Sequence, residues 1–310
     1  MRKWPVLLVL AAACGKDPGA TIDANSGSGG GTDAAADASV DTPPGTQWVS
    51  LISRSWTMAA GNEGYRCMRI QVPQDMWIGG FRAVAPLGTH HTVLTIDAND
   101  SNTGEYDCNA GSGTLTGQLL FASGVGTDEM DFPTGIATHL TAGTWINLNL
   151  HLFDVQDSGS LSDTSGIEVL TVPQSSVVHE ADVMFAGTYN INVPSDNTPH
   201  TASGGCNAPT DWHVFSLWPH MHQIGVHQKL TVTHSGVATT MLDTDYMFTE
   251  QKNHPIPETV FHSGDQIVTT CTYVNNTGAT ITFGDSSTAE MCFTGMYKYP
   301  AGGNAFGCVN

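Results

Sequence analysis

Two histidines one residue apart are the clearest chemical feature of the sequence. His220 and His222 lie in the stretch WPHMHQIG, residues 218–225. Side chains alternate between the two faces of a β-strand, so residues i and i+2 point the same way and both imidazoles could bind one metal ion. Pro219 cannot donate a ladder hydrogen bond, which favours a strand edge or a bulge here. Taken alone, the pattern also fits two semi-buried core histidines without a metal.

Other possible ligands are spread along the chain. His90 and His91 are adjacent in THHTVLTI, so both could bind one ion only at a strand end or a bulge, and the preceding PLGT supplies turn residues. His151 follows the alternating stretch WINLNL, and Met291 lies in STAEMC. A lone methionine usually fills a core. Beside histidines, however, its thioether favours copper, and Cu(I) in particular.

These residues must be positioned by β-strands. From Gln47 onward, short runs such as HHTVLTI, TWINLNLHLF, KLTVTH and QIVTTCTYV are rich in Val, Ile, Thr and aromatic residues, with Gly, Asn, Asp and Pro between them. No long stretch has the period of a helix, and many short strands separated by turns are typical of sandwiches and jelly rolls. The sequence therefore predicts an all-β chain with two tandem antiparallel jelly-roll β-sandwich domains, at residues 47–174 and 175–310.

The first residues have the pattern of an export signal followed by a tether. Arg2 and Lys3 precede an apolar run that is too short to span a bilayer. The small residues before Cys14 resemble the processing site of bacterial lipoproteins, so we expect a lipoprotein signal peptide at 1–14, with ordinary cleavage as the alternative. Residues 15–46, rich in Gly, Ala, Ser and Asp, predict a disordered linker. We expect an exported cell-envelope lipoprotein, attached to the outer membrane or the cell surface through lipidated Cys14, or a secreted protein.

Composition narrows the partners. The 310 residues include 29 acidic and 10 basic side chains, and the formal net charge of -19 argues against nucleic acid, because phosphate binding needs a basic patch. Besides Cys14 there are six cysteines, which in an exported protein allow up to three disulfides. There is no Cys-x-x-Cys pair, so a thiolate zinc site is not expected.

In this order, the histidines and the methionine resemble the copper type II, ascorbate-dependent monooxygenases, the family of peptidylglycine α-hydroxylating monooxygenase and dopamine β-monooxygenase. That family has two jelly-roll domains with one copper ion each. Its first copper is bound by an adjacent histidine pair and a later histidine, matched here by His90, His91 and His151. Its second is bound by an HxH motif and a methionine in a Glu-Met-Cys context, matched here by His220, His222 and Met291. The likeness covers roughly residues 60–300.

The resemblance implies two copper ions per chain, with ascorbate or another reductant as co-substrate. The ion at the HxH motif and the methionine would bind dioxygen and hydroxylate a substrate C–H bond. The ion at the first three histidines would store and deliver the second electron. The family's disulfides imply three pairs, Cys67–Cys108, Cys206–Cys308 and Cys271–Cys292.

The sequence departs from the peptide hydroxylase of that family at the positions that bind the substrate carboxylate. Trp218 stands in place of an arginine, Phe293 in place of an asparagine and Gly295 in place of a tyrosine. A C-terminal glycine peptide is therefore not expected, and Trp218 with Phe293 favours a small-molecule substrate that is apolar or aromatic. Asn149 and His213 are candidates for orienting the ligands. The remaining histidines are expected mostly at the surface.

Two other functions stay open. A copper-binding lipoprotein that sequesters or delivers the ion would keep all six ligands without turnover. A jelly-roll adhesion or carbohydrate-binding module would need no metal, and the ordered set of ligands argues against it.

Overall fold

The computed structural model describes residues 45–97, 101–109, 117–124, 127, 129–153, 159–284 and 286–310. The predicted signal peptide, Cys14 and nearly all of the predicted linker lie outside the described residues. Residues 42–310 form one compact unit. Within the described ranges, no helix has the length and hydropathy needed to cross a membrane.

Regular secondary structure in the described residues is almost entirely β-strand, as predicted. It contains 22 strands and one 3-10 helix of three residues, η1 (Gln174–Ser176). Strand β9 (Trp145–Phe153) shows how the sequence produces this. Its Ile and Leu residues at alternate positions are fully buried in the core, whereas the intervening Asn147, Asn149 and His151 lie on the opposite face. These polar residues are buried too, so β9 has one apolar face and one covered polar face.

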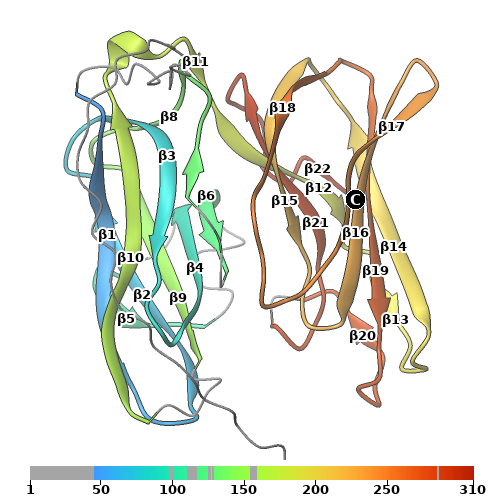
Figure 1. The fold of residues 1–310 in the computed structure, drawn as a ribbon, viewed down its shortest axis with the longest axis horizontal. Coiled ribbons are helices and arrows are strands. Elements are labelled where there is room, and N and C mark those ends of the chain that lie inside the picture. The colour runs from blue at the N-terminus through green and yellow to red at the C-terminus, as the bar shows by residue number, and fades with distance from the viewer. Residues whose placement is uncertain are drawn as a thin grey trace, which may run out of the picture. The chain divides into compact units, whose positions relative to one another are not determined.

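The first half of the chain forms two sheets (Figure 1), and the apolar core that they cover continues into buried residues of the second half such as Phe215 and Tyr297. One sheet has the order β1 (Gln47–Met58), β10 (Leu161–Val172), β3 (Met76–Val84), β8 (Ile136–Leu140) and β11 (His179–Glu180), with β7 (Met130–Asp131) paired to β3. The other has the order β5 (Gly104–Asp107), β2 (Glu63–Gln71), β9, β4 (Thr89–Ile96) and β6 (Gln118–Ser123). Pairing is antiparallel except between β11 and β8.

The second half forms a further sandwich. One sheet has the order β18 (His254–Phe261), β15 (Trp212–His220), β21 (Cys292–Tyr299), β12 (Asp182–Thr188) and β22 (Cys308–Val309). The other has the order β14 (Pro199–Asn207), β19 (Gln266–Val274), β16 (Gly225–His234) and β17 (Val237–Asp245). A short pair, β13 (Asn192–Val193) with β20 (Ile281–Thr282), lies beside them. All-β sandwich architecture is thus confirmed for the described residues.

The segment between the two halves does not separate them sharply. The expected boundary after residue 174 falls in η1, and β11, which follows it, pairs in parallel with β8 of the first half. The hydroxyl of Tyr297 in β21 donates a hydrogen bond to the carbonyl oxygen of Leu120 in β6, at 3.0 Å. The two halves therefore share buried contacts, and the division at 174/175 stays a prediction.

Three disulfides tie strands of each half together. They are Cys67–Cys108, Cys206–Cys308 and Cys271–Cys292. These are the pairs that the family resemblance implied, so that prediction is confirmed. Disulfides persist in oxidising compartments, which fits an exported protein.

Candidate metal centres

The first candidate centre lies on neighbouring strands of one sheet. Strands β4 and β9 are antiparallel, and their register places His91 directly opposite His151. The register shifts between Thr89 and His91, so His90 lies at a bulge. The Nδ1 atom of His91 lies 3.1 Å from Nδ1 of His90 and 3.3 Å from Nδ1 of His151. The bulge thus brings His90 and His91 together with His151. A bulge is one of the two local structures in which adjacent histidines could bind one ion.

Burial keeps these three imidazoles neutral. Desolvation, followed by the charge of His151, lowers the pKa of His90 to about 4. Desolvation also lowers the pKa of His91 well below its usual value, helped by His90 and His151, and it lowers the pKa of His151. A neutral imidazole has one free lone pair, and metal ligation requires that form. The cluster therefore presents unprotonated ligands at neutral pH.

Glu63 orients His151. Its Oε1 lies 2.6 Å from Nε2 of His151, and the ring of Tyr65 stacks on the imidazole with centroids 4.6 Å apart. An imidazole that donates through Nε2 leaves Nδ1 free to bind a metal. No local sequence pattern marks Glu63. Glu63 is brought to His151 by the pairing of β2 with β9, which places Tyr65 opposite His151. The sequence of one strand does not reveal this pairing.

The second candidate centre forms where β15 ends. His220 is the last residue of β15, and His222 follows in the turn, so alternation along one strand does not by itself place both imidazoles. Their ring centroids are 5.3 Å apart. β15 is an inner strand, but its pairing with β18 stops at Leu217, so Pro219 has a strand neighbour only in β21. The expected edge at Pro219 is therefore present locally.

Both imidazoles of the HxH motif are hydrogen-bonded through Nδ1. Nδ1 of His220 lies 2.9 Å from Oε1 of Gln251, and Nδ1 of His222 lies 3.2 Å from the carbonyl oxygen of Ala289. Each contact leaves Nε2 as the free nitrogen. Desolvation lowers the pKa of both histidines, with that of His222 reaching about 3, so they too are neutral.

A buried carboxylate joins the HxH segment to Met291. Glu290 is fully buried, and its Oε2 accepts hydrogen bonds from the backbone N–H groups of His222 (2.8 Å) and Met291 (3.2 Å). Its Oε1 accepts one from the backbone N–H of Ile224, at 2.9 Å. Desolvation raises the pKa of Glu290 to about 7 against the opposing effect of these donors. Glu290 thus holds the methionine segment against the HxH turn, a role that sequence analysis did not assign.

One cavity connects the two candidate centres. It has a volume of about 90 Å³, and it is lined by His91 and His151 of the first centre and by His220 and His222 of the second. Trp218 also lines it and stacks on His220, with ring centroids 5.0 Å apart. The other lining residues are Tyr65, Val93, Ala122, Ser123, Asn149, Phe248, Gln251 and Ser287. None of the described residues that line it is a lysine, an arginine or a carboxylate.

Three other residues suggested by the sequence differ in their position relative to the cavity. Asn149 lines the cavity, and its Nδ2 donates a hydrogen bond to the carbonyl oxygen of Asn109 at 2.9 Å. His213 does not line it; its Nδ1 lies 2.8 Å from Oε1 of Glu258, and its ring stacks on Tyr299. Phe293 packs in an aromatic group with Phe185 and other rings, away from the cavity lining.

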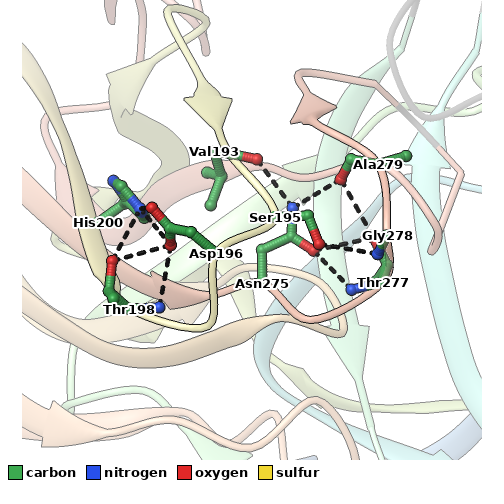
Figure 2. Close-up of polar contacts among 9 residues, drawn as sticks. All are labelled: Val193, Ser195, Asp196, Thr198, His200, Asn275, Thr277, Gly278 and Ala279. Atoms are coloured by element: carbon green, nitrogen blue, oxygen red, sulfur yellow. Dashed lines mark hydrogen bonds and ion pairs between the residues drawn. The ribbon is translucent and has the colours of Figure 1, made fainter.

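The other histidines are expected mostly at the surface, and none of them is buried: His179, His234 and His262 are exposed, and His139, His200, His227 and His254 are half-buried. Figure 2 shows His200 at 2.9 Å from Asp196, within a network of side chains that closes the turn between β13 and β14. In the same view, Asn275 closes the turn that follows β19 through bonds to Thr277 and Ala279. His227 and His234 pair with Asp243 and Asp265.

The donor set fits copper at both centres. The first offers three neutral imidazoles with converging Nδ1 atoms, all within 4.8 Å of one another. The second offers two neutral imidazoles, and Met291, which does not line the cavity, lies in a segment that Glu290 ties to His222 through backbone hydrogen bonds. Imidazole suits copper in both oxidation states, and a thioether favours Cu(I).

Comparison with known proteins agrees with this chemistry. Residues 179–309 match the family described as copper type II ascorbate-dependent monooxygenase, C-terminal domain. The human protein named DBH-like monooxygenase protein 1 is 25% identical over 243 residues, which cover 68% of this chain and 39% of that protein. Its mouse counterpart is 25% identical over 203 residues, covering 59% and 33%. The chain therefore spans between a third and two fifths of the length of these relatives.

Solved structures add little. The major capsid protein P2 of bacteriophage PM2 aligns over 80% of this chain and 96% of its own, with 10% identity and a TM-score of 0.29, too low to support an argument. The family match is informative because residues 179–309 include the HxH motif, Glu290 and Met291. The chain is therefore similar to the copper type II, ascorbate-dependent monooxygenases, and the match to their C-terminal domain spans residues 179–309.

Proposed function

We propose that the protein is a copper-dependent monooxygenase that binds two copper ions and hydroxylates a C–H bond of a small molecule. His90, His91 and His151 would hold one ion, and His220, His222 and Met291 the other. The observation that carries this proposal is the single cavity lined by histidines of both centres. A substrate in that cavity would contact histidines of both centres at once.

The reaction has a defined balance. One oxygen atom of dioxygen enters the C–H bond as a hydroxyl group, and the other leaves as water after taking up two protons. Two electrons must come from an external reductant, and ascorbate is the reductant in the family's name. Copper, when bound, supplies the redox chemistry that accepts these electrons and activates dioxygen.

The side chains of this chain position the ligands and give the cavity apolar walls. Glu63 fixes the Nε2 proton of His151, and the carbonyl oxygen of Ala289 fixes the Nδ1 proton of His222. Trp218 and Phe248 cover the second centre with apolar rings, since both line the cavity and Trp218 stacks on His220. Fixed ligand orientation and a dry cavity are what a protein contributes to a metal centre.

The cavity favours an uncharged, apolar or aromatic substrate. No charged side chain among the described residues lines it to bind a carboxylate, a phosphate or an ammonium group. Val93, Ala122, Trp218 and Phe248 give it an apolar wall. Ser123 and Asn149 add neutral polar groups that could orient a hydroxyl or a carbonyl.

We also propose that the protein is exported and attached to the cell envelope through a lipidated Cys14. The three disulfides support the export, and the residues before Cys14 support the lipidation. Mass spectrometry of the protein purified from membranes checks this: a diacylated N-terminal cysteine is expected, and an unmodified N-terminus would contradict the anchor.

Copper stoichiometry combined with oxygen consumption tests the catalytic proposal. The wild-type chain should bind two copper equivalents and consume dioxygen with ascorbate when a suitable apolar or aromatic substrate is present. His222→Ala should lose one equivalent and lower turnover by more than about 100-fold, because losing a ligand exceeds the 10- to 100-fold effect of losing a supporting contact. The matched control is His200→Ala, whose imidazole bonds to Asp196 in a surface turn.

The outcomes separate the candidate functions. Two bound equivalents with no substrate-dependent oxygen consumption would favour a protein that sequesters or delivers copper. Failure to bind copper at either centre would overturn the monooxygenase proposal altogether.

A further inference from the structure

A loop of the second half lies between the two candidate centres. Residues 246–253 connect β17 to β18. The ring of Phe248 in this loop lies 5.4 Å from that of His90, 5.2 Å from that of His91 and 6.2 Å from that of His222. Gln251 follows it and is 3% exposed. The loop therefore contacts both sets of ligands.

The side chain of Gln251 bridges the two centres directly. Its Nε2 lies 3.0 Å from Nε2 of His91, and its Oε1 lies 2.9 Å from Nδ1 of His220. One amide thus connects a histidine of the first centre to a histidine of the second.

Residues of the first half of the chain hold Gln251 in place through a hydrogen bond and close contacts. The hydroxyl of Thr127 donates to the carbonyl oxygen of Gln251 at 2.6 Å and accepts from the backbone N–H of Gly124. A Cβ atom at Gly124 would lie 3.1 Å from both Cβ and N of Gln251 and 3.3 Å from Cδ2 of His91. Glycine at this position therefore permits the close approach of the bridge.

The chemistry of an amide fixes how the two imidazoles are protonated. Its oxygen only accepts hydrogen bonds and its nitrogen only donates them. With Oε1 toward His220, that histidine must carry its proton on Nδ1. The Nε2 group of Gln251 then donates to His91, whose proton must also lie on Nδ1. If the amide is flipped, both histidines must carry the proton on Nε2.

To bind a metal, the two centres require the proton on different ring nitrogens of His91 and His220. The first centre converges through Nδ1 atoms, so His91 must carry its proton on Nε2 to ligate there. The second centre leaves Nε2 free, so His220 must carry its proton on Nδ1. With either amide orientation, only one of the two histidines has its converging nitrogen free.

We propose that Gln251 couples the two metal centres by linking the protonation patterns of His91 and His220. Either centre can bind copper while the bridge is intact, but both can bind copper only when the bridge opens. The inference rests on the proposed function, since it assumes that both centres bind copper. Copper binding at one centre then weakens binding at the other by the free energy of one net hydrogen bond. This raises the dissociation constant by about two- to tenfold.

Single-centre variants allow the coupling to be measured. His151→Ala leaves only the second centre able to load, and His222→Ala leaves only the first, while both variants keep the residues of the bridge. Cu(I) affinities are measured anaerobically by competition with a chromophoric chelator. The coupling factor is the product of the two dissociation constants of the wild type divided by the product of the two single-centre constants.

Three substitutions at glutamine positions isolate the bridge. Gln251→Met keeps the length of the side chain and removes both hydrogen bonds. Gln251→Glu provides two acceptor oxygens, so both histidines can adopt the protonation that their centres require. Gln223→Met is the matched control, because Gln223 is an exposed neighbour of His222 that bonds only weakly to Ser287, at 3.4 Å. The wild type and the control should show a factor of about two to ten, and both Gln251 variants a factor near one.

Imidazole ¹⁵N NMR of the metal-free protein gives a second readout that needs no copper. In the wild type, His91 and His220 should carry their protons on the same type of ring nitrogen. In Gln251→Glu they should differ, with the proton on Nε2 of His91 and on Nδ1 of His220. Different ring nitrogens in the wild type would overturn the bridge, and so would a coupling factor of one in the wild type.

These outcomes remain distinct from failure of the proposed function. If neither centre bound copper, the monooxygenase proposal would fall, whereas the ¹⁵N spectra would still decide whether the bridge ties the two histidines. If both centres bound copper with no coupling, the bridge would fall and the proposed function would stand.

Discussion

At the scale of single residues, burial decides the chemistry of the histidines. Imidazoles in water are partly protonated near neutral pH, and a protonated imidazole cannot ligate a metal. Desolvation lowers the pKa of His90 to about 4 and that of His222 to about 3. These imidazoles are therefore neutral over the whole physiological range of pH.

The same shifts predict how the stability of the metal-free protein depends on pH. Because the pKa of His222 is lower in the folded than in the unfolded chain, the unfolded chain binds more protons between about 3 and 6.5. The free energy of unfolding should therefore fall as the pH falls through this window, by up to about 1.4 kcal/mol per pH unit for each such histidine.

Urea unfolding at a series of pH values checks this. His222→Asn should have a shallower dependence on pH than the wild type, whereas Gln223→Asn, at the exposed neighbouring position, should keep the wild-type dependence. Equal slopes for His222→Asn and the wild type would show that His222 is not shifted.

At the scale of elements, the second centre depends on how the end of β15 is attached to the start of β21. Strand pairing brings Pro219 and His220 beside Thr294 and Phe293, but the HxH turn continues beyond the ladder. Glu290 completes the attachment through backbone N–H groups on both segments. The hydroxyl of Tyr273 in β19 adds a bond to the carbonyl oxygen of Met291, at 2.8 Å.

Glu290→Gln should weaken this attachment. An amide has one acceptor oxygen in place of two, so at least one buried N–H loses its partner, at a cost of about 1–3 kcal/mol. We expect a lower free energy of unfolding and weaker Cu(I) binding at the second centre, with the first centre unchanged in chelator competition.

The control is Glu105→Gln, because Glu105 is an exposed carboxylate with a 3.7 Å ion pair to Arg54. Its loss should cost less than about 1 kcal/mol. Equal effects at the two positions would contradict a special role for Glu290.

At the scale of the whole molecule, the cavity exists because the two halves share buried contacts. A register shift in the pairing of β4 with β6 leaves Leu120 outside the ladder. Its carbonyl oxygen accepts the hydrogen bond from Tyr297 of the second half, and both residues are buried. Gln251 and Thr127 make the corresponding polar contact beside the cavity.

Tyr297→Phe should lower the free energy of unfolding by about 1 kcal/mol, because it leaves the buried carbonyl oxygen of Leu120 without its donor. Urea unfolding measures this change. Tyr189→Phe serves as the control, since Tyr189 is 41% exposed and should tolerate the loss of its hydroxyl. A wild-type stability for Tyr297→Phe would mean that this contact does not hold the halves together.

The sequence alone determined the all-β architecture, and its resemblance to a known family implied the pairs of cysteines. Alternating Leu and polar residues in WINLNLHLF already define a strand with two different faces, and strand patterns are local properties of the chain. The ordered histidines, Met291 and the cysteine spacing carried the resemblance to the family. Which substrate enters, and which groups orient the ligands, are not local properties.

Tertiary structure decided how the site is assembled. The bulge at His90, the bond from Glu63 to His151 and the three backbone bonds to Glu290 depend on strand register, which one strand does not contain. The bridge of Gln251 joins residues 160 and 31 positions apart in the chain, so no local pattern marks it. Ligand types follow from sequence, but their orientation and coupling depend on contacts between strands that meet only in the folded chain.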